Sequence, residues 1–348
     1  MLEKVDRPRK IPVAGSIATW ISWDGLLAYN RSEMSSRFIR FVFYIGLTVF
    51  VSCSDVQEQA RNGSFESMGT TIYVQPSTAT SIVQKVFERV DEQMSEWKED
   101  SPLTKVNMQA GKSSVPCPIE LCSAVELALS IAEQTDGAFD PTWAALWNVW
   151  DFKATSLPEA TLISSRLHLV NWKHVVVEQN TIYLTKVGMA IGLGGIAKGI
   201  ALNQARDTLL HEGITDFMIV AGGQVLAQGA TRRIGIRKPD GIPSEFIGVV
   251  EITNACISTS GDYEKYFEVD GIRYHHIIDP RTGFPASGVR SVTVLAKDAA
   301  VADALSTALF VLGVETGMEF VENTERVEAL FIDRTSLVHK SSGFNLDK

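Results

Sequence analysis

Residues 248–260, with the sequence Gly-Val-Val-Glu-Ile-Thr-Asn-Ala-Cys-Ile-Ser-Thr-Ser, predict two short β-strands, 248–252 and 255–259, with no helix between them. The same pattern of short apolar and β-branched runs continues outward in both directions. Because the strands come in runs rather than in alternation with helices, the sequence favours an α+β fold with a largely antiparallel or mixed sheet. The other predicted strands are 70–74, 174–177, 181–185, 216–220, 233–236, 274–278, 289–296 and 327–332.

Helices are predicted where apolar residues recur every three or four positions. We expect these helices to pack on the sheet within one compact domain, residues 65–345, because no internal repeat and no low-complexity linker follows residue 64. The predicted helices are 81–97, 124–132, 197–210 and 299–312.

The composition of the 348-residue chain is that of a globular protein with a real core, since 45% of its residues are hydrophobic and 21% are charged. These values exclude a disordered chain, a collagen and a polytopic membrane protein. The 32 Lys and Arg against 41 Asp and Glu give a net charge of −9. Nucleic-acid binders present clustered basic residues, so no nucleic-acid partner is expected.

The N-terminus differs from the rest of the chain. Residues 1–52 carry seven Lys and Arg but four Asp and Glu, whereas the remainder is acidic. The apolar run 38–51 is too short to span a bilayer, which needs about 20 apolar residues. It has the length of a signal-peptide core, with Arg37 and Arg40 as its positive flank.

Ser52-Cys53 closes this apolar run and resembles a bacterial lipobox, in which the cysteine is lipidated. We therefore expect a signal peptide at 34–52, starting from Met34, and a lipidated tether at 53–64. Residues 1–33 are then an unassigned N-terminal extension. The expected location is the periplasmic side of the inner cell membrane, anchored by lipid on Cys53. The alternatives are a buried strand or an uncleaved anchor.

A glycine cluster, Gly192-Leu-Gly-Gly-Ile-Ala-Lys-Gly199, follows a strand and opens a helix. It matches the G-x-G-x-x-A pattern, but the next strand, 216–220, leads into Ala221-Gly-Gly-Gln224, without the acidic residue that a Rossmann unit uses for the ribose. It is not a Walker A motif, because Lys198 precedes a glycine. Free N–H groups at a helix N-terminus, together with Lys198, suit a pyrophosphate. The alternative is that these glycines only permit tight packing.

Asp303 and Thr307 are four residues apart, so they share one face of the last predicted helix. Both offer hard oxygen ligands, and Mg²⁺ binds through one or two carboxylates together with substrate phosphates. The neighbours of Asp303 are apolar, a setting in which an unpaired carboxylate is costly. A magnesium site is therefore one reading, and an acidic residue in the first helical turn is the other.

Two further segments carry chemistry. His275 and His276 are adjacent on a predicted strand, so their side chains point to opposite faces and cannot both ligate one metal. One is expected to be buried and the other exposed. The loop 136–141 contains Phe139, which can stack on an aromatic ligand or fill the core.

Taken together and in order, these segments resemble the ApbE family of flavin transferases, which move FMN from FAD onto a Thr or Ser of a target protein. The resemblance covers nearly all of residues 65–335, and family members are commonly exported lipoproteins. The segments are Met68-Gly-Thr70, Thr135-Asp-Gly-Ala-Phe-Asp-Pro141, Leu193-Gly-Gly-Ile-Ala-Lys-Gly199, Ser258-Thr-Ser-Gly-Asp-Tyr263, His276-Ile-Ile-Asp-Pro-Arg-Thr-Gly283 and Ala302-Asp-Ala-Leu-Ser-Thr307.

The resemblance implies roles for individual residues. Mg²⁺ is expected on the backbone carbonyl of Gly195 with Asp303 and Thr307, bridging the diphosphate of FAD. Lys198 would help to stabilise the departing AMP, and His276 and Asp279 are the candidates for the base that deprotonates the acceptor hydroxyl. The residues implied to contact FAD are Met68, Trp97, Ala138, Phe139, Asp140, Gly192, Lys198 and Ile277.

Two positions depart from the family pattern. The family usually has Asp where this chain has Gly192, and Gly-Gly-Asp where it has Gly222-Gly-Gln224. The expected function is an Mg²⁺-dependent FAD:protein FMN transferase that acts on an exported flavoprotein subunit and releases AMP. Two alternatives use the same site: an FAD pyrophosphatase that forms FMN and AMP, and a non-catalytic flavin-binding lipoprotein.

Overall fold

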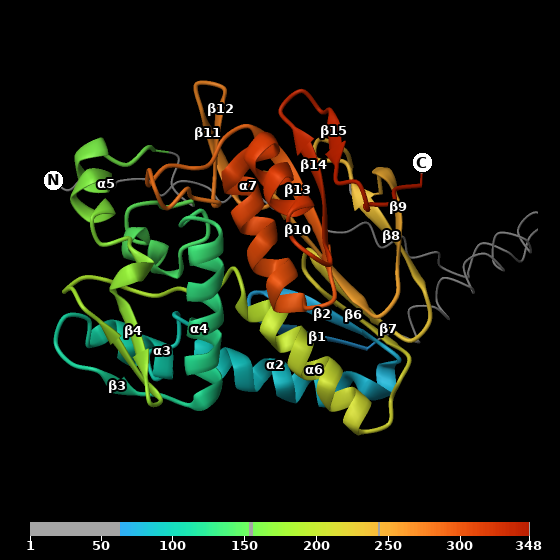
Figure 1. Cartoon of the computed structure of the whole chain (residues 1–348), viewed down its shortest axis with the longest axis horizontal. Coiled ribbons are helices and arrows are strands. Elements are labelled where there is room, and N and C mark those ends of the chain that lie inside the picture. Colours follow the sequence, from blue (N-terminus) through green and yellow to red (C-terminus); the bar gives the residue numbers. More distant parts are fainter. Residues whose placement is uncertain (1–62, 153–155, 243, 348) are drawn as a thin grey trace, which may run out of the picture. The chain divides into compact units, whose positions relative to one another are not determined.

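The computed structural model describes residues 63–347, apart from 153–155 and 243. The predicted N-terminal extension, the signal peptide and nearly all of the predicted tether therefore lie outside the described residues. The first strand, β1 (Gly63–Ser67), begins two residues before the expected domain boundary at 65. The described part of the chain is a single α+β unit, as predicted (Figure 1).

An eight-stranded sheet forms the centre of this unit, and every neighbouring pair of its strands is antiparallel. The order of the strands is β1-β2-β6-β7-β10-β13-β14-β15, so β2 pairs with a strand from the middle of the chain. The bounds of its other strands are β2 Thr70–Gln75, β6 Phe217–Ala221, β7 Gln224–Gln228, β10 Ala255–Gly261, β13 Val289–Ala296, β14 Val327–Asp333 and β15 Val338–Lys340.

Three helices form a layer on this sheet: α2 (Thr80–Met94), α6 (Ala197–His211) and α7 (Ala299–Glu322). Helix α7 packs against β10 and β13, and it also contacts α6, which contacts α2. In length and composition α7 could cross a membrane, but 61% of its most apolar window is buried inside the protein. It is therefore the central core helix.

A hairpin of β8 (Arg232–Arg237) and β9 (Phe246–Ile252) packs with the sheet through a second core cluster. The alternation of side chains along β10 explains how one strand serves both cores. Cys256 belongs to the core of the helix layer, whereas Ile257 belongs to the core of the hairpin. Ser258 is again on the helix side, where its hydroxyl meets Ser306 of α7.

The other described elements are further helices and two small sheets. Helix α4 contacts α7, and the small sheet β3-β5-β4 lies beside α3 and α4. The bounds are α3 Pro102–Met108, β3 Val115–Pro116, α4 Ile119–Gln134, the 3-10 helix η3 Pro141–Leu146, α5 Ala160–Leu167, β4 Val175–Glu178, β5 Thr181–Leu184, β11 Tyr266–Val269 and β12 Ile272–His275.

Several predicted boundaries were wrong. The strand predicted at 274–278 ends at His275, because β12 pairs only with the four residues of β11. The helix predicted to end at Trp97 ends at Met94, since Ser95 adopts an extended conformation. The helix predicted to end at residue 312 continues to Glu322 after a break at Gly313, whose φ is 82°.

Candidate functional site

The glycine cluster lies at the N-terminus of α6, and neighbouring loops fix its backbone. The Asn107 side chain accepts a hydrogen bond from the Ile191 N–H at 2.8 Å and donates one to the Ile191 carbonyl at 2.9 Å. The N–H of Gly192 donates to the carbonyl of Pro141 at 2.9 Å. No side chain caps α6, but most N–H groups at its start are used by the Leu193 carbonyl and by Asp303. Among the described residues, the N–H groups of Gly194, Gly195 and Lys198 have no partner, and these free groups suit an anion. We call residues 192–199 the cradle.

Lys198 is half-buried in the first turn of α6, and its Nζ atom donates to the carbonyl oxygen of Gly194 at 3.1 Å. Gly194 itself is exposed, so the cradle is open at this point. The ammonium group therefore lies next to the free N–H groups of the cradle, which adds a full positive charge to the partial charges of the helix terminus.

Asp303 is the buried carboxylate of the site, only 4% exposed on α7. One of its oxygens accepts the N–H of Gly199 at 3.0 Å, and the other accepts the side-chain amide of Gln224. Burial raises the pKa of the Asp303 carboxyl, and the charge of Lys198 and the Gly199 hydrogen bond partly oppose this. A carboxylate in this setting gains from a bound cation.

Gln224 leaves one atom unsatisfied when it donates to Asp303. Its Oε1 atom is buried and has no hydrogen-bond partner among the described residues. A buried carbonyl oxygen without a partner is costly, so a donor or a cation at this place would be favourable. The residue that departs from the family pattern is thus in direct contact with the predicted metal ligand.

Thr307 and Gly195 lie close together, as the predicted metal set requires. A Cβ atom built on Gly195 would lie 3.6 Å from the hydroxyl oxygen of Thr307 and 3.2 Å from the ring of Phe139. The Phe139 side chain belongs to the main core, so it fills the space behind the cradle. Asp303, Thr307 and the Gly195 carbonyl give three hard oxygen donors, which fit Mg²⁺.

The described residues contain no cluster of three or more His, Cys, Asp or Glu side chains that could hold a metal. A metal here would therefore need the hydroxyl, the main-chain carbonyl and oxygens of the substrate. Serine hydroxyls form a hydrogen-bonded chain that ends at Thr307. The hydroxyl oxygen of Ser306 lies 3.2 Å from that of Ser258 and 2.9 Å from that of Ser260, and the Ser260 hydroxyl lies 3.5 Å from that of Thr307.

The two adjacent histidines differ in their contacts. His275 is buried; its Nε2 atom lies 2.9 Å from the Ala286 carbonyl, and its Nδ1 atom accepts the N–H of Ile277. Both ring nitrogens are thus in use. His276 is partly exposed, and its Nδ1 atom lies 3.3 Å from the carbonyl of Lys265. A carbonyl only accepts hydrogen bonds, so a neutral His276 has its proton on Nδ1 and a free lone pair on Nε2.

Burial lowers the pKa of His276 to about 4, with further contributions from the charges of His275, Lys265 and Lys198. At neutral pH this ring is uncharged, so its free nitrogen can accept a proton.

An acidic pH should destabilise the protein through His275. Burial lowers its pKa from 6.5 to about 4, so the unfolded chain binds the proton first as the pH falls through this range, and the free energy of unfolding decreases. His275→Gln keeps a donor for the Ala286 carbonyl but does not titrate. Urea denaturation at pH 7 and pH 5 should show a smaller loss of stability for the variant than for the wild-type protein; equal losses would contradict this.

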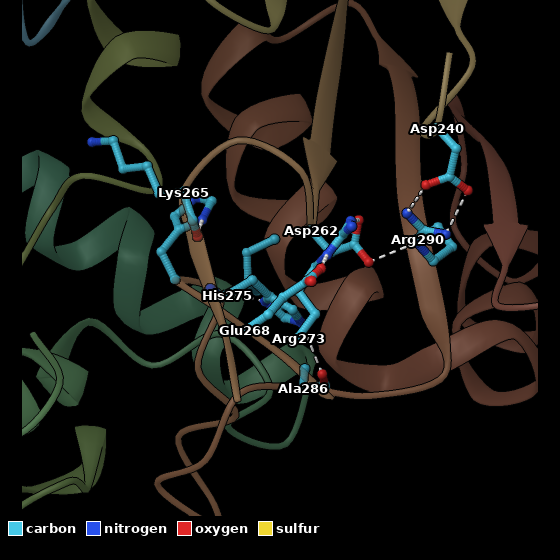
Figure 2. Close-up of polar contacts among 10 residues, drawn as sticks. Asp240, Asp262, Lys265, Glu268, Arg273, His275, Ala286 and Arg290 are labelled. Atoms are coloured by element: carbon cyan, nitrogen blue, oxygen red, sulfur yellow. Dashed lines mark hydrogen bonds and ion pairs between the residues drawn. The ribbon is translucent and has the colours of Figure 1, made fainter. Parts of the chain in front are cut away.

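A network of charged side chains orders the chain between β10 and β13 (Figure 2). The buried carboxylate of Asp262 accepts Arg290 Nε at 2.7 Å and Arg273 Nη1 at 3.3 Å. Arg290 also forms a double contact with Asp240, at 2.5 and 2.7 Å. Arg273 lies on β12, just before the histidines, so this network holds the histidine segment to the sheet.

Two predicted acidic residues are occupied by local structure. Asp140 caps η3: its Oδ1 atom accepts the N–H and the hydroxyl of Thr142, and its Oδ2 atom accepts the N–H of Trp172. Asp279 is held by the guanidinium of Arg281, with two contacts of 2.9 Å. His276 is therefore the better candidate for a base, because the Asp279 carboxylate is already ion-paired.

The structure also places the remaining predicted contacts to FAD. Met68 adopts a left-handed conformation, φ 49°, in the turn between β1 and β2, and Thr70 at the start of β2 lies beside Gly222. The side chains of Ala138 and Ile277 are buried, so these residues offer mainly their backbone to a ligand. Trp97 is 73% exposed.

Three tryptophans form a cluster next to the cradle. The rings of Trp97 and Trp147 have centroids 3.7 Å apart, and Trp143 lies 5.9 Å from Trp147. The Nε1 atom of Trp143 is 3.4 Å from the place that a Cβ atom of residue 192 would take. Sequence reasoning missed Trp143 and Trp147, although Trp143-Ala-Ala-Leu-Trp147 is an obvious aromatic run that could have drawn attention.

Sequence reasoning also missed Glu96, which lies in the loop after α2. Its Oε1 atom is 3.5 Å from the Cβ positions built on Gly192 and Gly194. Burial raises the pKa of this carboxyl, while hydrogen bonds from its own N–H and from Leu193 N–H, and the charge of Lys198, lower it. No local pattern in the sequence connects residues this far apart.

Comparison with known proteins identifies the family of this arrangement. The sequence model described as the ApbE family matches residues 68–331, which is most of the chain. The chain belongs to the ApbE family. A curated FAD:protein FMN transferase from Vibrio cholerae is 33% identical over 83% of this chain and 92% of its own length. The protein of the same name from Treponema pallidum is 35% identical over 75% of this chain and 79% of its own length.

Solved ApbE structures have the same fold. The ApbE protein of Thermotoga maritima superimposes with a TM-score of 0.74 at 32% identity, covering 81% of this chain and 96% of its own. The flavin transferase ApbE of Vibrio cholerae gives a TM-score of 0.74 at 31% identity, covering 81% and 97%. The predicted family and the predicted α+β fold are thus confirmed.

Proposed function

We propose that this chain is an FAD:protein FMN transferase that depends on Mg²⁺ and releases AMP. The curated relatives with this name support the reaction class. The observation that carries the proposal is the cradle with Lys198 beside the buried Asp303, because this combination suits a nucleotide pyrophosphate and a hard cation together.

Residues of this chain can bind the pyrophosphate of FAD and neutralise its negative charge. The free N–H groups of the cradle and the ammonium of Lys198 receive the pyrophosphate of FAD, and the tryptophan cluster offers an aromatic surface beside it. Asp303, Thr307 and the Gly195 carbonyl would hold Mg²⁺, which, when bound, neutralises negative charge on the phosphates. Lys198 then stabilises the charge that develops on the AMP oxygen.

The transfer step exchanges one P–O bond for another. The hydroxyl oxygen of a target Thr or Ser attacks the FMN phosphorus, and the bond from this phosphorus to the AMP oxygen breaks. His276 Nε2 takes the proton of the hydroxyl, since it is the free nitrogen of a neutral ring. The products are AMP and the flavinylated protein.

The test combines the protein with FAD, Mg²⁺ and an exported flavoprotein subunit that carries an acceptor Thr. In-gel flavin fluorescence on the subunit, with one AMP released per label, is the expected result. Free FMN and AMP without labelled protein would instead indicate the pyrophosphatase, with water as the acceptor. Bound FAD without any AMP release over hours would indicate a non-catalytic flavin-binding protein.

We further propose that the protein acts outside the cytoplasmic membrane and is anchored there by a lipid on Cys53, which lies outside the described residues. The apolar run 38–51 followed by Ser52-Cys53 supports this proposal. Cys53→Ser should move the protein from the membrane fraction to the soluble fraction, as measured by fractionation and immunoblotting. Unchanged membrane association of the variant would point to an uncleaved anchor.

A further inference from the structure

Gly192 is buried, and its backbone conformation is open to other residues. Its backbone is not in the left-handed region, so glycine is not required for conformation. A Cβ atom there would meet the Ala144 methyl at 3.2 Å, Trp143 Nε1 at 3.4 Å and the carboxyl oxygen Oε1 of Glu96 at 3.5 Å. Only the first contact is tight. The space beside Gly192 is therefore shared with a carboxylate that comes from another part of the chain.

The position of Glu96 is fixed by its own loop. The hydroxyl of Ser101 donates to the Ser95 carbonyl at 2.6 Å, and the hydroxyl of Thr104 donates to the Glu96 carbonyl at 3.4 Å. The carboxyl oxygen Oε1 lies 3.5 Å from the Cβ positions built on Gly192 and Gly194, so the side chain lies against the cradle. These contacts tie the loop after α2 to α3 on one side and to the cradle on the other.

We propose that Glu96 supplies the carboxylate of the cradle in place of a residue at 192, and that it accepts a hydrogen bond from a hydroxyl group of the bound nucleotide. This inference rests on the proposed function, since FAD is the ligand. An ionised carboxyl has about four acceptor positions. Because Oε1 lies beside the exposed Gly194, acceptor positions of this carboxyl face a ligand that enters over Gly194.

The negative charge of the Glu96 carboxylate determines which groups of FAD can bind next to it. A carboxylate repels phosphate oxygens, so the phosphates turn toward Lys198 and the free N–H groups, and hydroxyls turn toward Glu96. FAD has hydroxyls on the ribose of its adenosine half and on the ribityl chain of its FMN half. Glu96 would thus orient the dinucleotide along the cradle as well as bind it.

The proposal is tested by variants that remove the carboxylate at residue 96, add one at residue 192, or do both. Glu96→Gln should weaken FAD binding about tenfold to a hundredfold, because a charged hydrogen bond is replaced by a neutral one. Gly192→Asp should also weaken binding, since its carboxylate would face that of Glu96. The double variant Glu96→Ala with Gly192→Asp should bind FAD within about threefold of the wild-type protein, because it again has one carboxylate at this place.

The measurement is a flavin-fluorescence or calorimetric titration in Mg²⁺, with melting temperatures recorded for each variant. Titrations with FMN and ADP identify the half of FAD that loses affinity in Glu96→Gln. Wild-type affinity in a folded Glu96→Gln variant would overturn the inference, and so would a double variant no better than Gly192→Asp. A wild-type protein that does not bind FAD at all would instead overturn the proposed function.

Discussion

Asp303→Asn should abolish FMN transfer while the protein remains as stable as the wild type. The variant loses the only negative charge among the three predicted Mg²⁺ ligands, so we expect the affinity for the ion to collapse and the transfer rate to fall by roughly 100-fold or more. Stability should be retained because the new amide is the same size and a buried charge has been removed.

The hydrogen bonds around Asp303 explain why the amide fits. The side-chain oxygen of Asn can still accept the N–H of Gly199. Its NH₂ group would face the NH₂ group of Gln224, but Gln224 has a buried Oε1 atom without a partner in the described part of the chain. Rotation of the Gln224 amide by half a turn makes Oε1 the acceptor for the new amide at 303, so this contact is kept. The Gln224 NH₂ group then takes the place where Oε1 had no partner, so one buried polar group of Gln224 is unpaired before and after the substitution.

Asp262→Asn is the matched control, since Asp262 is also a buried carboxylate. Its partners are the guanidinium groups of Arg290 and Arg273, so removal of its charge should lower the melting temperature and leave Mg²⁺ binding intact. Calorimetric titration with Mg²⁺ and FAD, thermal unfolding and AMP release give the three readouts. Normal AMP release from Asp303→Asn would show that Asp303 is not a metal ligand.

Gly199→Ala should be the most destabilising single-methyl change in the cradle. A Cβ atom at this position would lie 2.2 Å from the Ala299 carbonyl oxygen and 2.5 Å from the Cα atom of Ala300. Both are backbone atoms of α7, so the clash can be relieved only if α6 and α7 move apart. Overpacking of this kind costs about 1–3 kcal/mol, which for a domain of this size lowers the melting temperature by roughly 2–6 °C.

The same movement should disturb the site, because the N–H of Gly199 donates to Asp303. Gly194→Ala is the control within the same motif: it adds the same methyl where the nearest atom is a flexible carboxyl oxygen of Glu96 at 3.5 Å. Thermal unfolding should show a large shift for residue 199 and a small one for residue 194. Equal shifts would mean that the close approach of the two helices does not require glycine.

Sequence reasoning succeeded where local pattern and burial agree. The runs at 255–259 and 289–296 are strands in the structure because each fills one or both cores with β-branched side chains. Asp303 and Thr307 share a helix face because both lie in the regular part of α7, before Gly313. The strand predicted at 274–278 extends too far at its C-terminal end. Ile277 and Ile278 suggested a strand because they are apolar, but in the structure they are buried side chains of the loop that follows the strand.

The contacts that define the candidate site are mostly nonlocal, and no spacing rule predicts them. Glu96 reaches the cradle from the loop after α2, and Gln224 reaches Asp303 from β7. Each pairing depends on how the sheet aligns its strands and how the helices cover it. From the sequence, Gln224 could be noted only as a departure from a pattern; its contact with Asp303 required the structure.

The order of strands in the central sheet affects how the chain can fold during its synthesis on the ribosome. Strand β2 lies between β1 and β6, with Ile72 opposite Ala221, so the two partners are 221 − 72 = 149 residues apart. At about 5–20 residues per second, a ribosome needs roughly 7–30 s to produce the missing partner. During this time the hairpin of β1 and β2 has an unpaired edge, which exposes it to aggregation. We therefore expect the growing chain to depend on chaperones until β6 has emerged.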